Sequence, residues 1–349
     1  MNICFIINDW KTVETKTETT IRLIHESAIR NHNVGILYTQ NLTIRNNVAY
    51  GFVKTIKKMD KVPDNIESFY KKAELIEKML PMNGFDAIFI RKNPPVDNIM
   101  LNFLDSIRDE TFLINDIHGI RKANNKLYTA LFHDPKNEFL PVTHVSKNIK
   151  YLKKTIEESN NEKMILKPLN AYGGSGVIVL EKNAKHNINS LLEFYIEGKE
   201  QKNYVIVQEY VEGAEKGDIR VLMLNGQPVG AYKRVPAADD IRANIHAGGK
   251  AEKHKLTEKE KMICKKIGPQ LVSDGIFFAG IDIINNKLIE VNVLSPGGIA
   301  NVNRLNKTKV QKKVIDFIED MIAKRNDIIN QRQAAIERKK LFNSEFNSD

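Results

Sequence analysis

The chain has 349 residues, and its length predicts two or three packed units. Hydrophobic residues make up 42% and charged residues 28%, an ordinary globular mixture that excludes collagen-like and wholly disordered chains. The 53 Lys and Arg residues outnumber the 43 Asp and Glu residues, so the net charge is +10. Such a balance favours an anionic small substrate or a polyanionic partner.

Several cellular settings are disfavoured. No segment approaches the roughly 18–20 uninterrupted apolar residues of a membrane helix, so we expect no membrane partner. The apolar start of the chain ends at Asn8-Asp9 without a basic segment before it, which indicates a buried strand rather than a signal peptide. Cys4 and Cys264 form no CxxC pair, so we expect no disulfide framework and a cytoplasmic protein. No nucleic-acid-binding motif accompanies the positive charge, so we expect no nucleic-acid partner.

The first part of the chain alternates strands and helices, which predicts a parallel sheet covered on both faces. The apolar runs predict strands at 2–7, 33–38, 87–91 and 112–115. Helical spacing predicts helices at 19–30, 66–80, 97–109 and 126–132.

The second part has a different pattern. Apolar runs predict strands at 163–168, 177–181, 204–210, 278–284 and 288–293, and Asn225-Gly226 predicts a hairpin between 219–224 and 228–233. Residues 257–274 have helical spacing, with Thr257 as N-cap and Glu260 three residues later. A long charged helix is predicted at 309–341. Residues 235–250 have weak periodicity and two glycines, so we expect a mobile loop that closes over a bound substrate.

A glycine-rich bend, Gly173-Gly174-Ser175-Gly176, connects two of these strands. It lacks the ending of a P-loop, and a strand rather than a helix follows it, so it is no dinucleotide fingerprint. Such a bend is often only a hairpin tip. Here Lys167 ends the preceding strand and Lys126 begins a helix upstream, and two lysines beside a glycine-rich hairpin can hold a triphosphate.

Three oxygen-bearing side chains lie on the last two strands. Glu290 and Asn292 share a face because they are two residues apart, and oxygen ligands of this kind suit Mg²⁺. A regular two-residue turn at Asn285-Asn286 would place Asp282 opposite Ile289. We therefore expect a longer loop or a bulge that brings Asp282 opposite Glu290.

Taken in order, these motifs resemble those of the ATP-grasp ligases, and more closely those of the prokaryotic-type glutathione synthetases. The resemblance covers about residues 2–302. It is carried by Ile90-Arg91-Lys92-Asn93-Pro94-Pro95, Lys126, Lys167-Pro168 with its glycine loop, Gln208-Glu209-Tyr210-Val211, Gly217-Asp218-Ile219-Arg220-Val221, Arg234-Val235-Pro236, Ile241-Arg242-Ala243-Asn244, Ala247-Gly248-Gly249, Gly280-Ile281-Asp282-Ile283-Ile284 and Glu290-Val291-Asn292.

The resemblance implies an α/β ATP-grasp fold. It would have an open parallel-sheet substrate domain at 1–120, a lid subdomain at 121–202, a catalytic subdomain at 203–306 and a helical tail at 307–349. It also implies that the donor carboxylate attacks the γ-phosphate of ATP, and that an amine then attacks the resulting acyl phosphate. In glutathione synthetase the donor is γ-glutamylcysteine and the acceptor is glycine.

The resemblance also assigns roles to residues. Lys126, Lys167 and the loop Gly173, Gly174, Ser175 and Gly176 would hold the ATP phosphates. Gln208, Glu209, Tyr210 and Val211 would meet adenine, and Asp218 would lie near the ribose. Asp282, Glu290 and Asn292 would hold Mg²⁺, with Mn²⁺ as an alternative. Arg220 and Arg234 would stabilise the reacting groups. Peptide substrate would lie at Arg91, Arg242, Asn244, Ser295, Gly297 and Gly298.

The chain departs from the family pattern in three places. Asn93 stands where Asp is usual, Gly297-Gly298 stands where a Thr-Cys-type pair is frequent, and the tail beyond about residue 324 is extra. Another ATP-grasp ligase with a different donor or acceptor therefore stays open, as does a nonenzymatic glutathione- or nucleotide-binding protein. We expect a homo-oligomer, and the distal tail is a candidate for the subunit contact.

Overall fold

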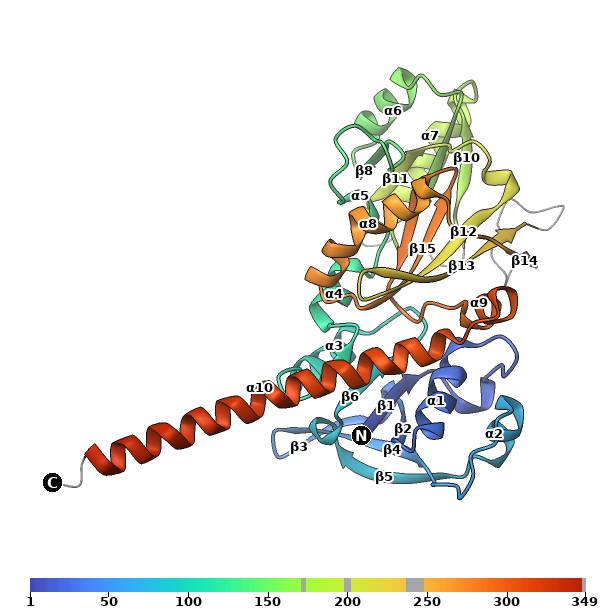
Figure 1. Ribbon diagram of the computed structural model, residues 1–349. Helices are drawn as coiled ribbons and strands as arrows, with labels where there is room; N and C mark the ends of the chain where they lie inside the picture. Colours follow the sequence, from blue (N-terminus) through green and yellow to red (C-terminus); the bar gives the residue numbers. More distant parts are fainter. Residues whose placement is uncertain (171–173, 198–201, 237–247, 347–349) are drawn as a thin grey trace.

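The computed structural model describes residues 1–170, 174–197, 202–236 and 248–346. Three sheets follow one another from the lower to the upper end of the molecule in Figure 1. The seven-stranded sheet at the lower end comes from the start of the chain, the five-stranded sheet lies in the middle, and the four-stranded sheet lies at the upper end. Some predicted residues lie outside the described residues. These are Arg242 and Asn244 of the expected peptide site, Gly173 of the glycine bend, and most of the expected mobile loop.

The lower sheet has a parallel centre, as predicted. Its parallel strands are β2 (Asn33–Tyr38), β1 (Asn2–Ile7), β6 (Ala87–Ile90) and β7 (Phe112–Ile114). Alternate residues of β1 enter different cores because successive side chains point to opposite faces. One face packs on α1 (Thr19–Ile29) and the start of α10 (Val310–Phe346), and the other on α3 (Asn98–Asp105) and α4 (Ile117–Ala123).

An antiparallel extension of this sheet was not predicted. It consists of β3 (Leu42–Arg45), β4 (Val48–Ile56) and β5 (Leu75–Pro81). The helix predicted at 66–80 is therefore wrong in its second half, since α2 spans only Ile66–Lys72. Seven residue pairs join β5 to β4, and this ladder satisfies the backbone groups that a helix would have satisfied internally. Nothing in the local spacing of 75–81 reveals that partner strand.

The middle sheet is antiparallel throughout. Its order is β14 (Lys250–Lys253), β13 (Gln227–Val235), β12 (Asp218–Leu224), β15 (Phe278–Ile284) and β16 (Lys287–Asn292). Helix α8 (Glu258–Ser273) covers one face, and Thr257 and Glu260 form the predicted capping box at its start. Asn225 and Gly226 form the predicted hairpin turn, both with positive φ.

The upper sheet has the order β10 (Ile178–Glu181), β9 (Lys163–Pro168), β11 (Val205–Glu209) and β8 (Thr143–Ser146). Two helices that were not predicted, α6 (Ile149–Glu158) and α7 (Lys185–Ile196), pack on it and form a separate hydrophobic core. The remaining short elements are α5 (Leu127–Ala130), α9 (Ile299–Asn306) and the 3₁₀ turns Trp10–Thr12, Thr39–Asn41, Met82–Gly84 and Ala214–Lys216.

The hydrophobic cores divide the molecule differently from the sheets. Two cores each contain side chains of both the lower and the middle sheet, so these two sheets are joined by continuous packing. The third core is confined to residues of the upper sheet and its helices. Apolar burial is the main favourable contribution to folding, so the upper unit is stabilised by its own core and meets the rest across a cleft.

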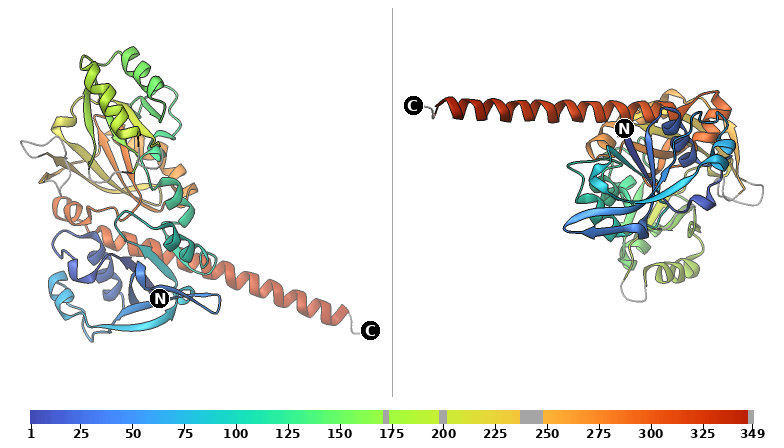
Figure 2. Two further views of the ribbon diagram at one scale, coloured as in Figure 1. Left: turned by 180° about the vertical axis from the view of Figure 1, so that it is seen from behind. Right: turned by 90° about the horizontal axis from the view of Figure 1, so that it is seen from below.

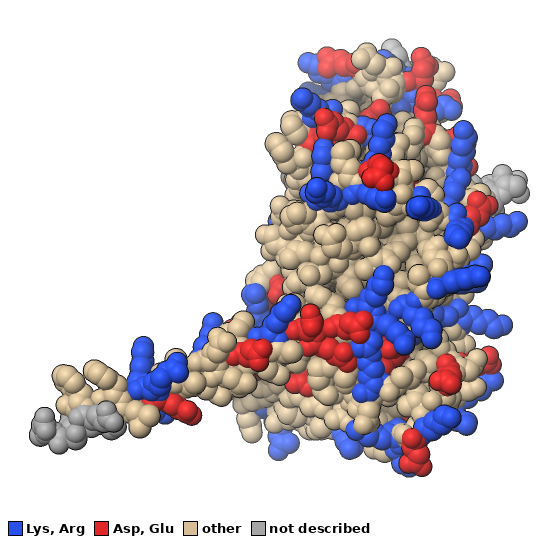
Figure 3. All heavy atoms as spheres, in the orientation of Figure 1, with Lys and Arg blue, Asp and Glu red and all other residues tan. Residues whose placement is uncertain are grey.

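Helix α10 leaves the body of the molecule. Its first turns pack against α1 and the lower sheet, and its distal part projects as a single rod in every view (Figures 1 and 2). Lys and Arg side chains are spread over the face shown in Figure 3, while acidic side chains gather along the proximal part of this helix. Arg30, the residue after α1, pairs with two carboxylates of α10, Asp316 and Glu319, and with Glu26 of α1.

The backbone of α8 passes close to the Asn225-Gly226 turn, and this contact between helix and hairpin can be tested. A Cβ added at Gly268 would lie 2.2 Å from the carbonyl oxygen of Gly226. We predict that Gly268→Ala lowers the free energy of unfolding by about 1–3 kcal/mol through overpacking, although alanine favours a helix intrinsically by about 1 kcal/mol.

Urea unfolding would measure this change. Gly84→Ala is the matched control, because its added Cβ would meet only Pro81 Cγ, at 3.6 Å. Equal or higher stability of Gly268→Ala would contradict the close approach.

Candidate active site

One face of the middle sheet carries a group of charged side chains. Arg220 on β12 lies opposite Asp282 on β15, and Asp218 lies opposite Arg234 on β13. Directly opposed residues of antiparallel strands point to the same side of a sheet. Asp282 in turn lies opposite Glu290, which brings β16 into the same row.

A bulge produces the alignment of Asp282 with Glu290. The turn is the tight one, since Asn285 and Asn286 both have positive φ and Ile284 pairs with Lys287. The register then shifts between Ile283 and Asp282, and Ile289 is the extra residue on β16. The expected position of Asp282 opposite Glu290 is thus confirmed; of the two routes to it, the bulge occurs and the longer loop does not.

The four charged groups of β12, β13 and β15 form a continuous ion-pair network. Arg220 Nε and Nη2 donate to the two oxygens of Asp282 at 2.5 and 2.9 Å. Arg234 donates to both oxygens of Asp218 at 2.6 and 2.7 Å, and its Nη2 also lies 2.9 Å from Asp282 Oδ2. All four side chains are largely buried, so bidentate pairing compensates for the lost hydration.

The network separates the two carboxyl groups electrostatically. Burial opposes the charge of Asp282, but Arg220 and Arg234 outweigh it and hold its pKa below the ordinary value. Burial, followed by the nearby charge of Asp282, raises the pKa of Asp218. The ionised form is therefore favoured more strongly at Asp282 than at Asp218.

Two lysines face this cluster from neighbouring elements. Lys126, at the start of α5, lies 3.3 Å from Glu290 Oε1. Lys167, at the end of β9, is buried and donates to Gln208 Oε1 at 2.8 Å, and Gln208 donates to Thr143. Burial lowers the pKa of the Lys167 ammonium to about 8; the Glu290 carboxylate opposes this shift and the Lys126 ammonium adds to it. An anion beside Lys167 would favour its charged form.

A cleft lies between the upper and middle sheets at these lysines. Its walls come from α5, β9, β11 and β16, and its lining includes Lys126, Thr129, Thr143, Lys167, Ile206, Gln208, Leu288 and Ile289. A second hollow, which includes Lys126, Glu290 and Asn292 in its wall, adjoins it. Of the predicted phosphate and metal residues, Lys126, Lys167, Glu290 and Asn292 thus line two adjoining hollows that share Lys126.

The predicted adenine segment ends β11 at the edge of this cleft. The backbone N–H of Glu209 is already used, since it donates to the Val142 carbonyl at 2.8 Å. In the described part of the chain the N–H groups of Tyr210 and Val211 have no hydrogen-bond partner, so they remain free for a ligand. Of the glycine bend, Gly174 and Gly176 have positive φ and the bend is exposed between β9 and β10.

The predicted peptide-binding residues that the structure describes lie at or beside the turn after β16. Arg91 Nη2 donates to the Pro296 carbonyl at 3.1 Å and Nε to Thr20 at 3.2 Å. Its Nη1 is buried without a partner among the described residues, and burial lowers its pKa to about 9. Ser295 and Gly298 both have positive φ, so the turn is sharply bent next to Arg220.

Several residues that support the site were not predicted. Thr19 Oγ1 accepts from the backbone N–H groups of Gly298 and Ile299, both at 3.2 Å. Thr129 Oγ1 accepts from the N–H of Val291, between Glu290 and Asn292, at 3.2 Å. Such threonines carry no spacing signal, because their partners are distant in sequence. Tyr232 lies opposite Arg220, and its two-residue spacing from Arg234 could have revealed that it shares their face.

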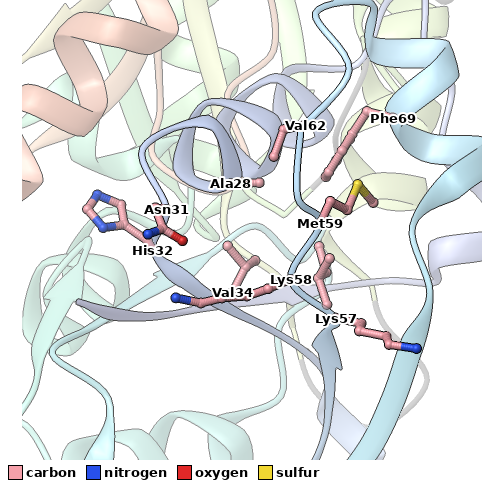
Figure 4. Close-up of a pocket in the computed structure, with 10 residues that line it drawn as sticks. Ala28, Asn31, His32, Val34, Lys57, Lys58, Met59, Val62 and Phe69 are labelled. Carbon is pink, nitrogen blue, oxygen red and sulfur yellow. The ribbon is translucent and has the colours of Figure 1, made fainter.

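A further pocket lies away from this region, in the lower unit (Figure 4). It is lined mainly by apolar side chains of α1, β2 and α2 and contains none of the predicted site residues; those labelled are Ala28, Asn31, His32, Val34, Lys57, Lys58, Met59, Val62 and Phe69. This pocket is therefore separate from the charged residues on the face of the middle sheet.

The described residues also limit which metal sites and membrane-spanning helices the chain can form. In the described part of the chain, no group of three or more His, Cys, Asp and Glu side chains is arranged to hold a metal ion. A site made of Asp282, Glu290 and Asn292 would therefore depend on further oxygen ligands from a substrate. Within the same ranges, no helix combines the length and apolar character needed to cross a membrane.

Comparison with known proteins gives a consistent result. The model of the prokaryotic glutathione synthetase N-terminal domain matches residues 1–121, and that of the ATP-grasp domain matches residues 125–307. The glutathione synthetase of Gloeobacter violaceus is 32% identical over 327 residues, 91% of this chain and 96% of the relative. That of Thermosynechococcus vestitus is 30% identical over 91% of this chain and 99% of the relative.

A solved structure of the ATP-grasp ligase PsnB, complexed with a minimal precursor, Mg and ADP, has the same fold. Its TM-score is 0.58 at 12% sequence identity, over 92% of this chain and 98% of that chain. The ATP-grasp fold expected from the sequence is thereby confirmed. The chain belongs to the prokaryotic glutathione synthetase family, whose members are ATP-dependent, ADP-forming carboxylate–amine ligases.

Proposed function

We propose that the chain is a glutathione synthetase, which joins γ-glutamylcysteine to glycine and converts ATP to ADP and phosphate. The observation that carries the proposal is the pairing of Arg220, Arg234 and Asp282 on one sheet face with Lys126 and Lys167 beside it. Such a surface can hold a polyphosphate and a reacting carboxylate together, while the family membership supplies the substrates.

The metal residues fit Mg²⁺ in their chemistry. Asp282 keeps its charge, Glu290 shares its row, and the Asn292 amide group donates to Asp282 Oδ2 at 3.2 Å, which leaves the amide oxygen of Asn292 free. When bound there, Mg²⁺ neutralises phosphate charge during phosphoryl transfer. Two carboxylates and one amide also suit Mn²⁺, which we propose as a substitute.

The chain's own residues then position the reactants. Lys126 and Lys167 neutralise ATP phosphates, with the bend Gly173, Gly174, Ser175 and Gly176 above them, and the segment Gln208, Glu209, Tyr210 and Val211 meets adenine. Asp218, proposed from the sequence to lie near the ribose, is held by Arg234 and fixes that guanidinium. Arg220 and Arg234 face the transferring phosphoryl group. In-line transfer needs alignment and charge neutralisation rather than a protein nucleophile.

The second half of the reaction takes place beside the turn after β16. The donor carboxylate attacks the γ-phosphorus and ADP leaves; the glycine amine then attacks the acyl carbon and phosphate leaves. Arg91, Ser295, Gly297 and Gly298 border this place, and we assign Arg242 and Asn244 to it from the sequence resemblance. Arg220 Nη1 donates to the Gly297 carbonyl of this turn in a long hydrogen bond of 3.5 Å, so the guanidinium reaches the turn itself.

We further propose the division 1–120, 121–202, 203–306 and 307–349 for the substrate, lid, catalytic and tail units. The separate core of the upper sheet supports a lid that moves as one body. A reducing compartment, the cytoplasm, fits the two free and buried thiols Cys4 and Cys264.

The distal part of α10 is proposed to bind a second copy of this chain. Ile328, Ile336, Phe342 and Phe346 are 52–75% exposed, and they continue the helical stripe whose first turns are buried against the lower sheet. About 20 residues of helix project over ~30 Å, and an isolated helix of this length is marginal in water. Pairing with a second copy would cover these apolar side chains; a stable interface of this kind buries roughly 1,200 Å² or more.

The substrate assignment predicts the outcome of an ADP-release assay over a panel of donors and acceptors. We expect the highest kcat/KM with γ-glutamylcysteine plus glycine, and loss of ADP release when either is omitted. Higher kcat/KM with a different donor or acceptor would identify another ATP-grasp ligase. Nucleotide binding without ADP release for any pair would indicate a binding protein.

The metal assignment predicts that Glu290→Gln lowers turnover at least ~100-fold, about 2.7 kcal/mol in the barrier, because phosphate charge loses its counter-ion. The Mg²⁺ concentration for half-maximal activity should rise in the variant. Glu181→Gln, an exposed position on β10, is the control. A folded Glu290→Gln protein with full activity and unchanged Mg²⁺ dependence would remove Glu290 from the metal site.

The assembly proposal predicts that truncation after Asn326 lowers the mass measured by light scattering and leaves turnover at saturating ATP unchanged. Phe342→Glu in the full chain should have the same effect, since it places a charge in the apolar stripe. An unchanged mass in both variants would exclude the tail as the subunit contact. A folded truncated protein that keeps its mass but loses turnover would instead give the tail a catalytic role.

A further inference from the structure

Tyr232 lies in the central row of the site without a role in the scheme above. On neighbouring strands, Tyr232 lies opposite Arg220, Arg220 opposite Asp282, and Asp282 opposite Glu290. All four side chains therefore point to one face of the sheet. Tyr232 is 3% exposed as a residue, and no hydrogen bond joins its hydroxyl to another described residue. The hydroxyl is not one of the fully enclosed polar atoms that lack a partner, so it can donate to a ligand in the site.

The ring of Tyr232 shapes the turn after β16. A Cβ added at Gly298 would lie 2.9 Å from Tyr232 Cε1 and 3.1 Å from its hydroxyl oxygen, and Gly298 has a φ of 126°. No side chain fits at position 298 while this ring is present. Gly297, by contrast, has room for a side chain, since an added Cβ would meet nothing within 4 Å. Tyr232 thus fills the space beside Gly298, and Gly297 borders an open space.

The same turn is fixed by other contacts that leave Tyr232 free. Arg91 donates to the Pro296 carbonyl, Thr19 accepts from the Gly298 N–H, and Arg220 Nη1 lies 3.5 Å from the Gly297 carbonyl. None of these groups uses the phenol. The turn therefore presents a rigid, glycine-lined surface with one unsatisfied hydroxyl at its side.

The charges nearby select the kind of group that this hydroxyl would meet. Arg220 and Arg234 on the same face are balanced by Asp282 and Asp218. Arg91, which borders the turn from the lower sheet, makes no ion pair with a described residue and has a buried Nη1 without a partner among them, so the surroundings favour an anion. A neutral phenol can donate one hydrogen bond to such an anion. A carboxylate of the substrate that is not itself phosphorylated has the matching chemistry.

The geometry points to Tyr232 as a positioning and specificity-determining residue whose hydroxyl donates to a non-reacting carboxylate of the peptide or amino-acid substrate lying along Gly297-Gly298. This inference rests on the proposed ligase function. The ring narrows the site beside Gly298, and the hydroxyl fixes the substrate next to Arg220.

Tyr232→Phe tests the hydroxyl with little change of volume. A hydrogen bond to a charged group is lost, so the KM of one non-nucleotide substrate should rise about tenfold or more. The KM of ATP, kcat and the midpoint of thermal unfolding should stay close to the parent values. Tyr204→Phe, at a half-exposed tyrosine, is the matched control and should change none of these.

A substrate analogue identifies the partner group. Replacing a non-reacting carboxylate of the affected substrate by a carboxamide should raise KM in the parent protein, and raise it much less in Tyr232→Phe. Unchanged KM values in Tyr232→Phe, or equal carboxamide effects in both proteins, would overturn the inference. So would a parallel loss of kcat, all KM values and thermal stability, which a purely structural role predicts.

The parent protein reports on the function separately. If it releases no ADP with γ-glutamylcysteine and glycine, the glutathione synthetase assignment fails. The Tyr232→Phe comparison is then made with the pair that the panel identifies.

Discussion

The site depends on the pairing of Asp282 with Arg220 and Arg234. These groups are buried between two sheets, where an unpaired charge would be strongly destabilising. Their mutual hydrogen bonds hold three strands in one register and keep the carboxylate of Asp282 ionised although it is buried. The metal role proposed for Asp282 depends on this, because the arginines keep its carboxylate charged and fixed.

The three cores divide the walls of the cleft between two separately packed parts of the molecule. The lower and middle sheets share two cores, so the turn after β16 and the charged row belong to one packed body. The upper sheet has a core of its own, and its Lys167 and Gln208 reach the cleft from a separate body. A shift of that body changes the distance of Lys167 from Glu290 without disturbing the ion-pair network.

The sequence predicted the regular parts of this arrangement well. The apolar runs of β1 and β2 and the capping box of α8 are local signals, and each matches the structure. The strand β5 was mistaken for helix because its partner β4 is what makes it a strand. In the site, motif residues were recognised individually, but Tyr232, Thr19 and Thr129 owe their places to contacts between distant segments, and no spacing reveals these.

The bulge on β16 has a consequence for how this segment can vary. Side chains alternate along a strand, so one further residue between Lys287 and Glu290 would exchange the inward and outward positions. Glu290 and Asn292 would then face α8 and its apolar core, and Val291 would face the cleft. Loss of the extra residue, Ile289, would instead leave a regular ladder with Glu290 still opposite Asp282, but it would remove a side chain of the cleft wall. This arm can therefore lose its bulge and keep its polar face, whereas a single insertion before Glu290 would turn two oxygen-bearing side chains away from the cleft at once.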